Sequence, residues 1–133
     1  MSLGIKQATS RRDPFRRLGD SPAAGKLLLA ERRAKGAPLP PAPYEKFTEN
    51  TIVDAEALRI ELVRIDQQGW AAAPEEIVLG VNALSAPIRD DDGELVAMIS
   101  LMSSIQFISR QPSRELIDGI KGAAREISEM LRL

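Results

Sequence analysis

Two apolar segments separated by a short acidic turn constrain the fold of this 133-residue chain most strongly. Residues 83–88 read ALSAPI and residues 95–102 read LVAMISLM, and Asp90, Asp91, Asp92 and Gly93 lie between them. Asp and Gly are typical of hairpin turns, so the pattern predicts two antiparallel strands. Apart from single Ser residues both strands are apolar on both faces, so both faces must be covered. We expect helices on one face and a partner or an internal cavity on the other.

Three helical segments flank this hairpin. The first is predicted over residues 22–35, because Ser21 is a good N-cap and Pro22 suits the first helical position. The second is predicted over residues 54–69, with an apolar stripe and a terminal glycine, and the third begins near residues 112–113. The order helix, helix, hairpin, helix predicts an α+β domain with helices packed on a curved antiparallel sheet.

Composition excludes several kinds of chemistry. The chain has no Cys and no His, which removes thiol nucleophiles, His-based catalysis, the usual zinc sites and disulfides. Glu75 and Glu76 are adjacent, so on an extended strand they point in opposite directions and form no acid–base pair. We therefore predict no enzyme, cofactor or metal site. The apolar runs are too short to span a membrane and no signal peptide is visible, which predicts a cytoplasmic protein without a membrane partner.

Positive charge is concentrated at the start of the chain. Residues 1–36 carry a net charge of +6, and the remainder carries −7. Residues 1–20 show no helical or strand period, and we expect a basic leader that is either a cloning remnant or disordered. The predicted domain is residues 21–133.

A Gly-Lys pair near the first helix raises the question of phosphate binding. Five residues separate Gly19 from Gly25, where a P-loop has four, and Leu27 stands where the loop requires a hydroxyl. A nucleotide site is therefore excluded. Ala23, Ala24 and Gly25 leave the first helical turn nearly bare, and its free N–H groups favour an anion. The alternative is that small residues only allow close packing against a neighbour.

The segment GWAAAPEEIVLGVNALSAPIRDDDGELVAMISL resembles the effector-binding domain of IclR-type bacterial transcription regulators. Upstream, SPAAGKLLLAE and FTENTIVDAEALRIELVRIDQQGWA resemble further blocks of that family, and the resemblance covers residues 18 to 133. The residues that match the central signature of the family are Gly69, Glu76, Ala83, Leu84, Ser85, Ile88 and Asp90. The resemblance implies a GAF-like sheet with helices packed on it.

The resemblance also implies a function. Such a domain senses a small organic effector, carboxylate-bearing or aromatic, and transmits binding through a homodimer or homotetramer to a DNA-binding domain. No winged helix-turn-helix is recognised here, and we expect the first part of the effector domain to be absent or replaced by residues 1–20. We therefore expect DNA contact only through a domain outside this chain. The alternative is a structural oligomerisation domain whose pocket is filled by its own side chains.

The family's pocket maps onto a small set of positions. Ser100 and Met102 share one face of their strand with Val96 and Met98, and Trp70 is expected in the core. Lys26 is expected to point away from the ligand and to be structural or exposed. This version of the pocket is unusually apolar, which favours a bulky hydrophobic effector. The ligand-binding residues implied by the resemblance are Ala23, Ala24, Gly25, Ala73, Ala83, Ser100 and Met102.

Overall fold

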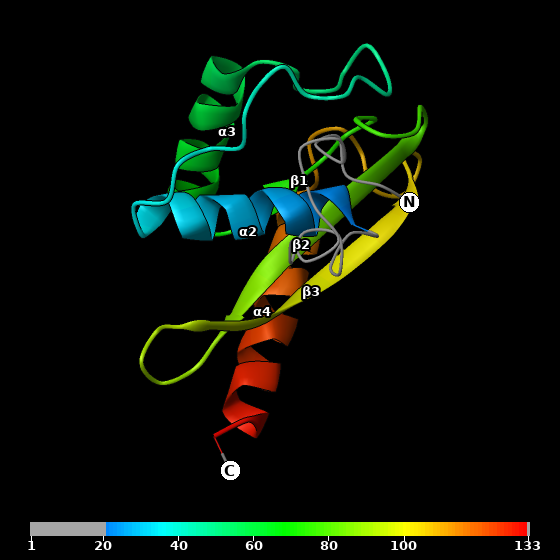
Figure 1. The fold of residues 1–133 in the computed structure, drawn as a ribbon. Helices are drawn as coiled ribbons and strands as arrows, with labels where there is room; N and C mark the ends of the chain where they lie inside the picture. Colours follow the sequence, from blue (N-terminus) through cyan, green and yellow to red (C-terminus); the bar gives the residue numbers. More distant parts are fainter. Residues whose placement is uncertain (1–20, 133) are drawn as a thin grey trace.

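The computed structural model describes residues 21–132 and has the predicted α+β architecture (Figure 1). The three strands form one antiparallel sheet in the order β1-β2-β3. The leader predicted for residues 1–20 lies outside the described residues. The elements are α2 (Pro22–Ala34), α3 (Ala55–Gln68), β1 (Ala71–Ala72), β2 (Val81–Arg89), β3 (Leu95–Ser104) and α4 (Arg114–Met130).

Each helix begins with a side-chain cap. Ser21 accepts a hydrogen bond from the N–H of Ala24, Asp54 caps α3 and Ser113 caps α4 in the same way. A cap satisfies an amide that has no acceptor within the helix. Gly69 ends α3 with φ of 80°, a left-handed conformation that glycine adopts without strain. The predicted helix starts and the glycine stop are therefore confirmed.

The β2–β3 hairpin is the main feature of the sheet. Ser85 lies opposite Ser100, and the register is continuous except for a shift between Ile88 and Arg89, next to the acidic turn. Both strands are longer than predicted, because pairing continues through Asn82 and Ser103 into polar residues. Ladder hydrogen bonds do not require apolar side chains, so hydropathy alone underestimates strand length.

The two faces of the hairpin are covered by different helices, which corrects the expectation of helices on one face only. Figure 1 shows α2 and α4 on opposite sides of the β2–β3 hairpin. Ala83 on β2 packs with α2 and α3 residues such as Leu62, whereas Leu84 packs with Ile120 of α4. Trp70 packs against this second cluster, as expected. Among the described residues, no helix is long and apolar enough to cross a membrane.

The core on the α2 and α3 side yields a stability prediction. Leu62 is fully buried, whereas Ile60, two residues away on the same helix, is 57% exposed. We expect Leu62→Ala to lower the free energy of unfolding by about 2–5 kcal/mol, because it leaves a cavity in a packed core. Ile60→Ala, the matched control, is expected to change it by less than about 0.5 kcal/mol. Urea unfolding measures both, and equal effects would contradict this description of the core.

Candidate functional site

An open groove lies between the start of α2 and strand β3. Its volume is about 730 Å³. The helix presents side chains at three- and four-residue spacing, and the strand presents every second side chain, so each element turns one face toward the groove. The lining residues are Ser21, Ala24, Leu28, Leu95, Val96, Ala97, Met98, Ser100 and Met102.

The residues implied by the family resemblance separate into three groups. Ala24, Ser100 and Met102 line the groove. Gly25 instead lines a cavity of about 30 Å³ on another side of α2. The remaining residues are buried in the core cluster shared by α2, α3 and the sheet, and they are Ala23, Ala73 and Ala83. Whether any of the seven contacts a ligand stays a prediction.

The first turn of α2 is less open than the sequence indicated. The N–H of Ala24 donates to Ser21 Oγ at 3.2 Å, and the N–H of Gly25 donates to the Ser21 carbonyl at 3.1 Å. The expectation of three unshielded amides is therefore wrong for these two residues. The N–H of Ala23 has no acceptor within the helix. Ser21 and Leu28 also line the groove, and the sequence analysis did not assign either of them to the site. Ser21 was interpreted only as a helix cap, and Leu28 lies seven residues later, a spacing that places both on one face of the helix.

Ser100 supplies a hydroxyl at the floor of the groove. Its Oγ lies 2.9 Å from the buried Oγ of Ser85, and Ser85 Oγ donates to the carbonyl of Ile99 at 3.2 Å. Because the Ser85 hydroxyl already donates its one hydrogen to Ile99, it accepts the hydrogen bond that the Ser100 hydroxyl donates. Ser100 Oγ is therefore left with lone pairs that can accept a hydrogen bond from a molecule in the groove.

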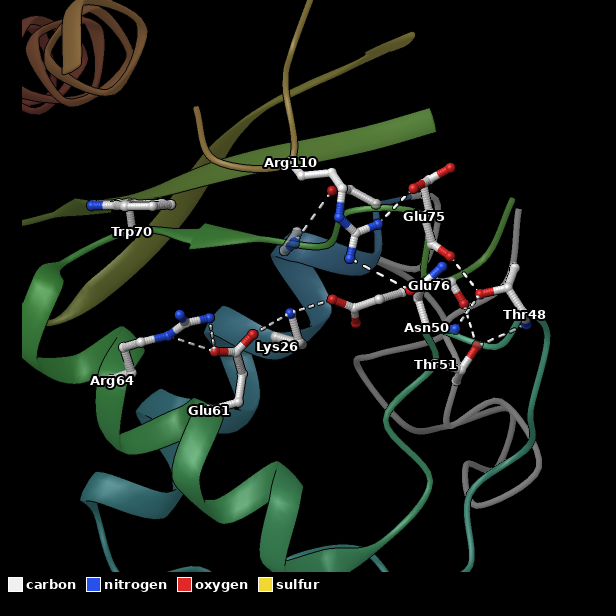
Figure 2. Close-up of polar contacts among 12 residues, drawn as sticks. Lys26, Thr48, Asn50, Thr51, Glu61, Arg64, Trp70, Glu75, Glu76 and Arg110 are labelled. Atoms are coloured by element: carbon white, nitrogen blue, oxygen red, sulfur yellow. Dashed lines mark hydrogen bonds and ion pairs between the residues drawn. The ribbon is translucent and has the colours of Figure 1, made fainter. Parts of the chain in front are cut away.

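Behind the groove, Lys26 joins three parts of the chain. Its Nζ lies 2.7 Å from an oxygen of Glu61 on α3 and 2.8 Å from an oxygen of Glu76 (Figure 2). We call Lys26, Glu61 and Glu76 the Lys26 cluster. Lys26 is only 7% exposed, so this contact is shielded from water. Lys26 is not among the residues that line the groove, and it is buried, not exposed. Its structural role stays a prediction.

The two carboxylates of the Lys26 cluster have opposite pKa shifts. Burial raises the pKa of Glu76 above its ordinary value and outweighs the attraction of Lys26. Burial also acts on Glu61, but Lys26 and Arg64 together hold the pKa of Glu61 below its ordinary value. The ionised form is therefore favoured at Glu61 and disfavoured at Glu76, although both carboxylates contact the Lys26 ammonium.

A turn before β2 holds Glu76 in place. Glu75 has φ of 54°, so residues 75 and 76 lie in a turn, which corrects the expected extended strand. The Thr51 hydroxyl donates to the carbonyl of Glu76 and accepts from the N–H of Thr48 at 3.0 Å (Figure 2). Glu75 pairs instead with Arg110. The two carboxylates therefore have different partners, Arg110 for Glu75 and Lys26 for Glu76.

Comparison with known proteins identifies the class of this domain. Residues 20–129 match the family model described as "Bacterial transcriptional regulator IclR C-terminal". The HTH-type transcriptional regulator BhcR of Paracoccus denitrificans is 36% identical over 106 residues, which cover 78% of this chain and 38% of BhcR.

Solved structures agree with this match. The Thermotoga maritima IclR structure has a TM-score of 0.64 and 30% identity over 82% of this chain and 45% of its own. The inducer-binding domain of an Acinetobacter PobR double mutant, in complex with 3-hydroxybenzoic acid, has a TM-score of 0.59 and 26% identity, covering 82% and 62%.

The chain belongs to the IclR family of bacterial transcriptional regulators and corresponds to its C-terminal domain. The family and these relatives are regulators of transcription, not enzymes. The chain spans less than half the length of BhcR and of the Thermotoga protein. Among the described residues, no group of three or more His, Cys, Asp or Glu side chains is arranged to hold a metal ion.

The Lys26 cluster yields a second prediction. Lys26→Met removes the shared cation and leaves two carboxylates together in a shielded position, so we expect a loss of about 3–5 kcal/mol of stability at neutral pH. The control is Lys35→Met, because Lys35 forms an exposed ion pair with Glu94. That variant is expected to leave stability unchanged. Urea unfolding of both variants measures the difference, and equal stability would contradict a structural role for Lys26.

The opposite pKa shifts yield a pH prediction. Because the pKa of Glu76 is raised above 4.5 on folding, its contribution to stability is present below that value and is lost as the pH rises through the raised pKa. In Glu76→Gln this loss cannot occur, so we expect the variant to gain stability relative to the original protein as the pH rises from about 4.5 through the raised pKa of Glu76. Glu61→Gln should show the reverse trend below about pH 4.5, because the stability that the lowered pKa of Glu61 contributes is lost as the pH falls through that pKa. Parallel trends in urea unfolding would contradict the assignment.

Proposed function

We propose that this domain senses a small apolar carboxylic acid bound in the groove between α2 and β3. The observation that carries the proposal is that one open groove of about 730 Å³ is bordered by both the α2 N-terminus and the Ser100 hydroxyl. That volume suits a small organic molecule, and an apolar lining with few polar groups is typical of such sites. Leu28, Met98 and Met102 supply the apolar walls.

The two polar ends of the groove favour different ligand groups. The α2 N-terminus carries partial positive charge and favours the carboxylate. Ser21 Oγ and the Ala24 N–H are the groups of this helix start that border the groove, and a carboxylate that replaced Ser21 Oγ would gain the hydrogen bond from the Ala24 N–H. Ser100 Oγ is an acceptor, so it favours a ligand hydroxyl or amine at the other end. The ligand class is therefore an apolar or aromatic acid with a distant donor group.

The structure of a related domain in complex with a small molecule supports this class of ligand. The PobR inducer-binding domain forms a complex with 3-hydroxybenzoic acid, a molecule that carries a carboxylate and, in the meta position, a hydroxyl on one apolar ring. In this chain the groove of about 730 Å³ is lined by two Met side chains, which favours a long or bulky acid, because Met adapts to irregular shapes.

The response is proposed to pass through a homodimer or homotetramer to a DNA-binding domain outside this chain, in the cytoplasm. The family's role in transcription and the HTH-type name of BhcR support this step. A ligand changes such an assembly only if it binds one arrangement of subunits better than another. The alternative function, a structural oligomerisation domain with a self-filled pocket, is disfavoured by the open volume of the groove.

Thermal unfolding with a panel of aromatic and aliphatic acids tests the proposal, and 3-hydroxybenzoate is the first probe. A ligand at about 100 times its Kd stabilises the folded state by about 2.7 kcal/mol, which raises the Tm measurably. We expect the amide of an active acid to bind at least about tenfold more weakly, because it lacks the charge that the helix N-terminus favours.

A blocking variant locates the site. Met102 is 39% exposed in the groove, so Met102→Trp is expected to fill the space and abolish the ligand-induced rise in Tm. Leu79→Trp is the control, because Leu79 is 60% exposed and does not line the groove. If no acid stabilises the original protein, the sensor proposal fails and the structural alternative gains support. A response that survives Met102→Trp would move the site elsewhere.

A further inference from the structure

A buried serine lies beside the hydroxyl that faces the groove. Ser85 on β2 pairs with Ser100 on β3, and the exposed fraction of Ser85 is 0%. Side chains alternate between the two faces of a strand, so Ser85 lies on the same face as Ala83, which packs with α2 and α3 residues. Ser100 lines the groove and Ser85 does not. A ligand in the groove can therefore contact Ser100, whereas Ser85 is shielded from it.

The register of the hairpin explains why the two hydroxyls meet. Ile105 donates its N–H to the Gly80 carbonyl, which marks these two residues as a hydrogen-bonded pair. Such pairs alternate with non-hydrogen-bonded pairs along an antiparallel ladder, so Ser85 and Ser100 form a non-hydrogen-bonded pair. Side chains approach most closely in pairs of this kind, whose Cα atoms are about 4.5 Å apart. The distance of 2.9 Å between the two Oγ atoms agrees with this geometry.

Only one direction of donation satisfies both contacts of Ser85. Its Oγ lies 3.2 Å from the carbonyl oxygen of Ile99 and 2.9 Å from Ser100 Oγ. A carbonyl can only accept, and each serine hydroxyl has a single hydrogen to donate. If Ser85 donated to Ser100, the contact with Ile99 would contain no hydrogen. Ser85 therefore donates to Ile99 and accepts from Ser100, which leaves the lone pairs of Ser100 for the groove.

We propose that Ser85 is a positioning residue that makes the floor of the groove a hydrogen-bond acceptor, so that the site selects acids with a donor group distant from the carboxylate. Ser85 acts on the ligand of the same groove, so this inference rests on the proposed function, but the selection is made by a residue that the ligand does not touch. Among the described residues neither hydroxyl has a further hydrogen-bond partner, so Ser85 is the group that holds the hydrogen of Ser100 away from the groove.

The preference follows from the cost of reversing the Ser100 hydroxyl. A ligand N–H or O–H donates to the free lone pairs of Ser100 without disturbing the serine pair. A ligand group that can only accept requires the hydrogen of Ser100, so this hydroxyl must rotate away from Ser85. Ser85 then loses the hydrogen bond that it accepts, and water cannot replace it because Ser85 is fully buried. The net value of one hydrogen bond corresponds to a difference of about fivefold in Kd.

A matched pair of ligands tests this selection. The acids 3-(methylamino)benzoate and 3-methoxybenzoate have nearly the same shape, but only the first has an N–H to donate. We expect the first to bind the original protein about fivefold more tightly than the second. Ser85→Ala removes the acceptor that holds the Ser100 hydrogen, so the two Kd values of this variant are expected to agree within about twofold. Isothermal titration calorimetry of the full chain measures both values in each protein.

Ser103→Ala is the control for the removal of a serine hydroxyl from the hairpin. Ser103 lies on the opposite face of β3 from Ser100 and does not line the groove. This variant is expected to keep the fivefold preference. A purely structural role of Ser85 would change both Kd values by the same factor, so the ratio of the two values is the decisive measurement. An unchanged ratio in Ser85→Ala, or an equal loss of preference in Ser103→Ala, would overturn the proposal.

Neutron diffraction from crystals of the perdeuterated original protein tests the role of Ser85 without a ligand. We expect the deuterium of Ser85 to point at the Ile99 carbonyl and the deuterium of Ser100 to point at Ser85. A Ser85 deuterium that points at Ser100 would overturn the proposal even if acids bind. If neither acid binds the original protein, the sensor function loses support, and the deuterium positions still decide the role of Ser85. The two failures are therefore distinguishable.

Discussion

The need to cover both faces of the β2–β3 hairpin determines the rest of this domain. Ala83 and Leu84 are adjacent on β2, and their side chains enter different core clusters. Neither face can be left to water without exposing a large apolar area, so α2 packs on one side and α4 on the other. The groove exists because α2 covers its face only in part and leaves the β3 side of that face open.

The Lys26 cluster fixes α2 in this position. Lys26 extends from α2 and meets one carboxylate from α3 and one from the turn before β2. A buried set of ion pairs adds little net stability. It does require a defined geometry, because each buried charge needs its partner close by. The cluster thus ties α2, the helix that borders the groove, to α3 and to the turn before β2. Apolar packing alone tolerates sliding of a helix more readily.

The fold was largely predictable, and the site only in part. Caps at Ser21 and Asp54 are local signals, since a side chain and an amide three residues away form them. The family resemblance supplied the domain class, but it assigned Ala73 and Ala83 to a pocket, and both are buried in the core. Their depth depends on how closely α2 and α3 approach the sheet, and neither the residue type nor its strand parity contains that distance.

The sequence by itself determined the helix ends, the acidic turn, the alternation along β3 and the exclusion of His and Cys chemistry. These properties follow from residue types at short separations, where backbone geometry leaves few choices. Only the tertiary structure decided that Ser21 and Ser100 line one groove and that Lys26 is buried between two carboxylates. Each of these arrangements joins segments more than 30 residues apart, and their meeting depends on the packing of the whole domain.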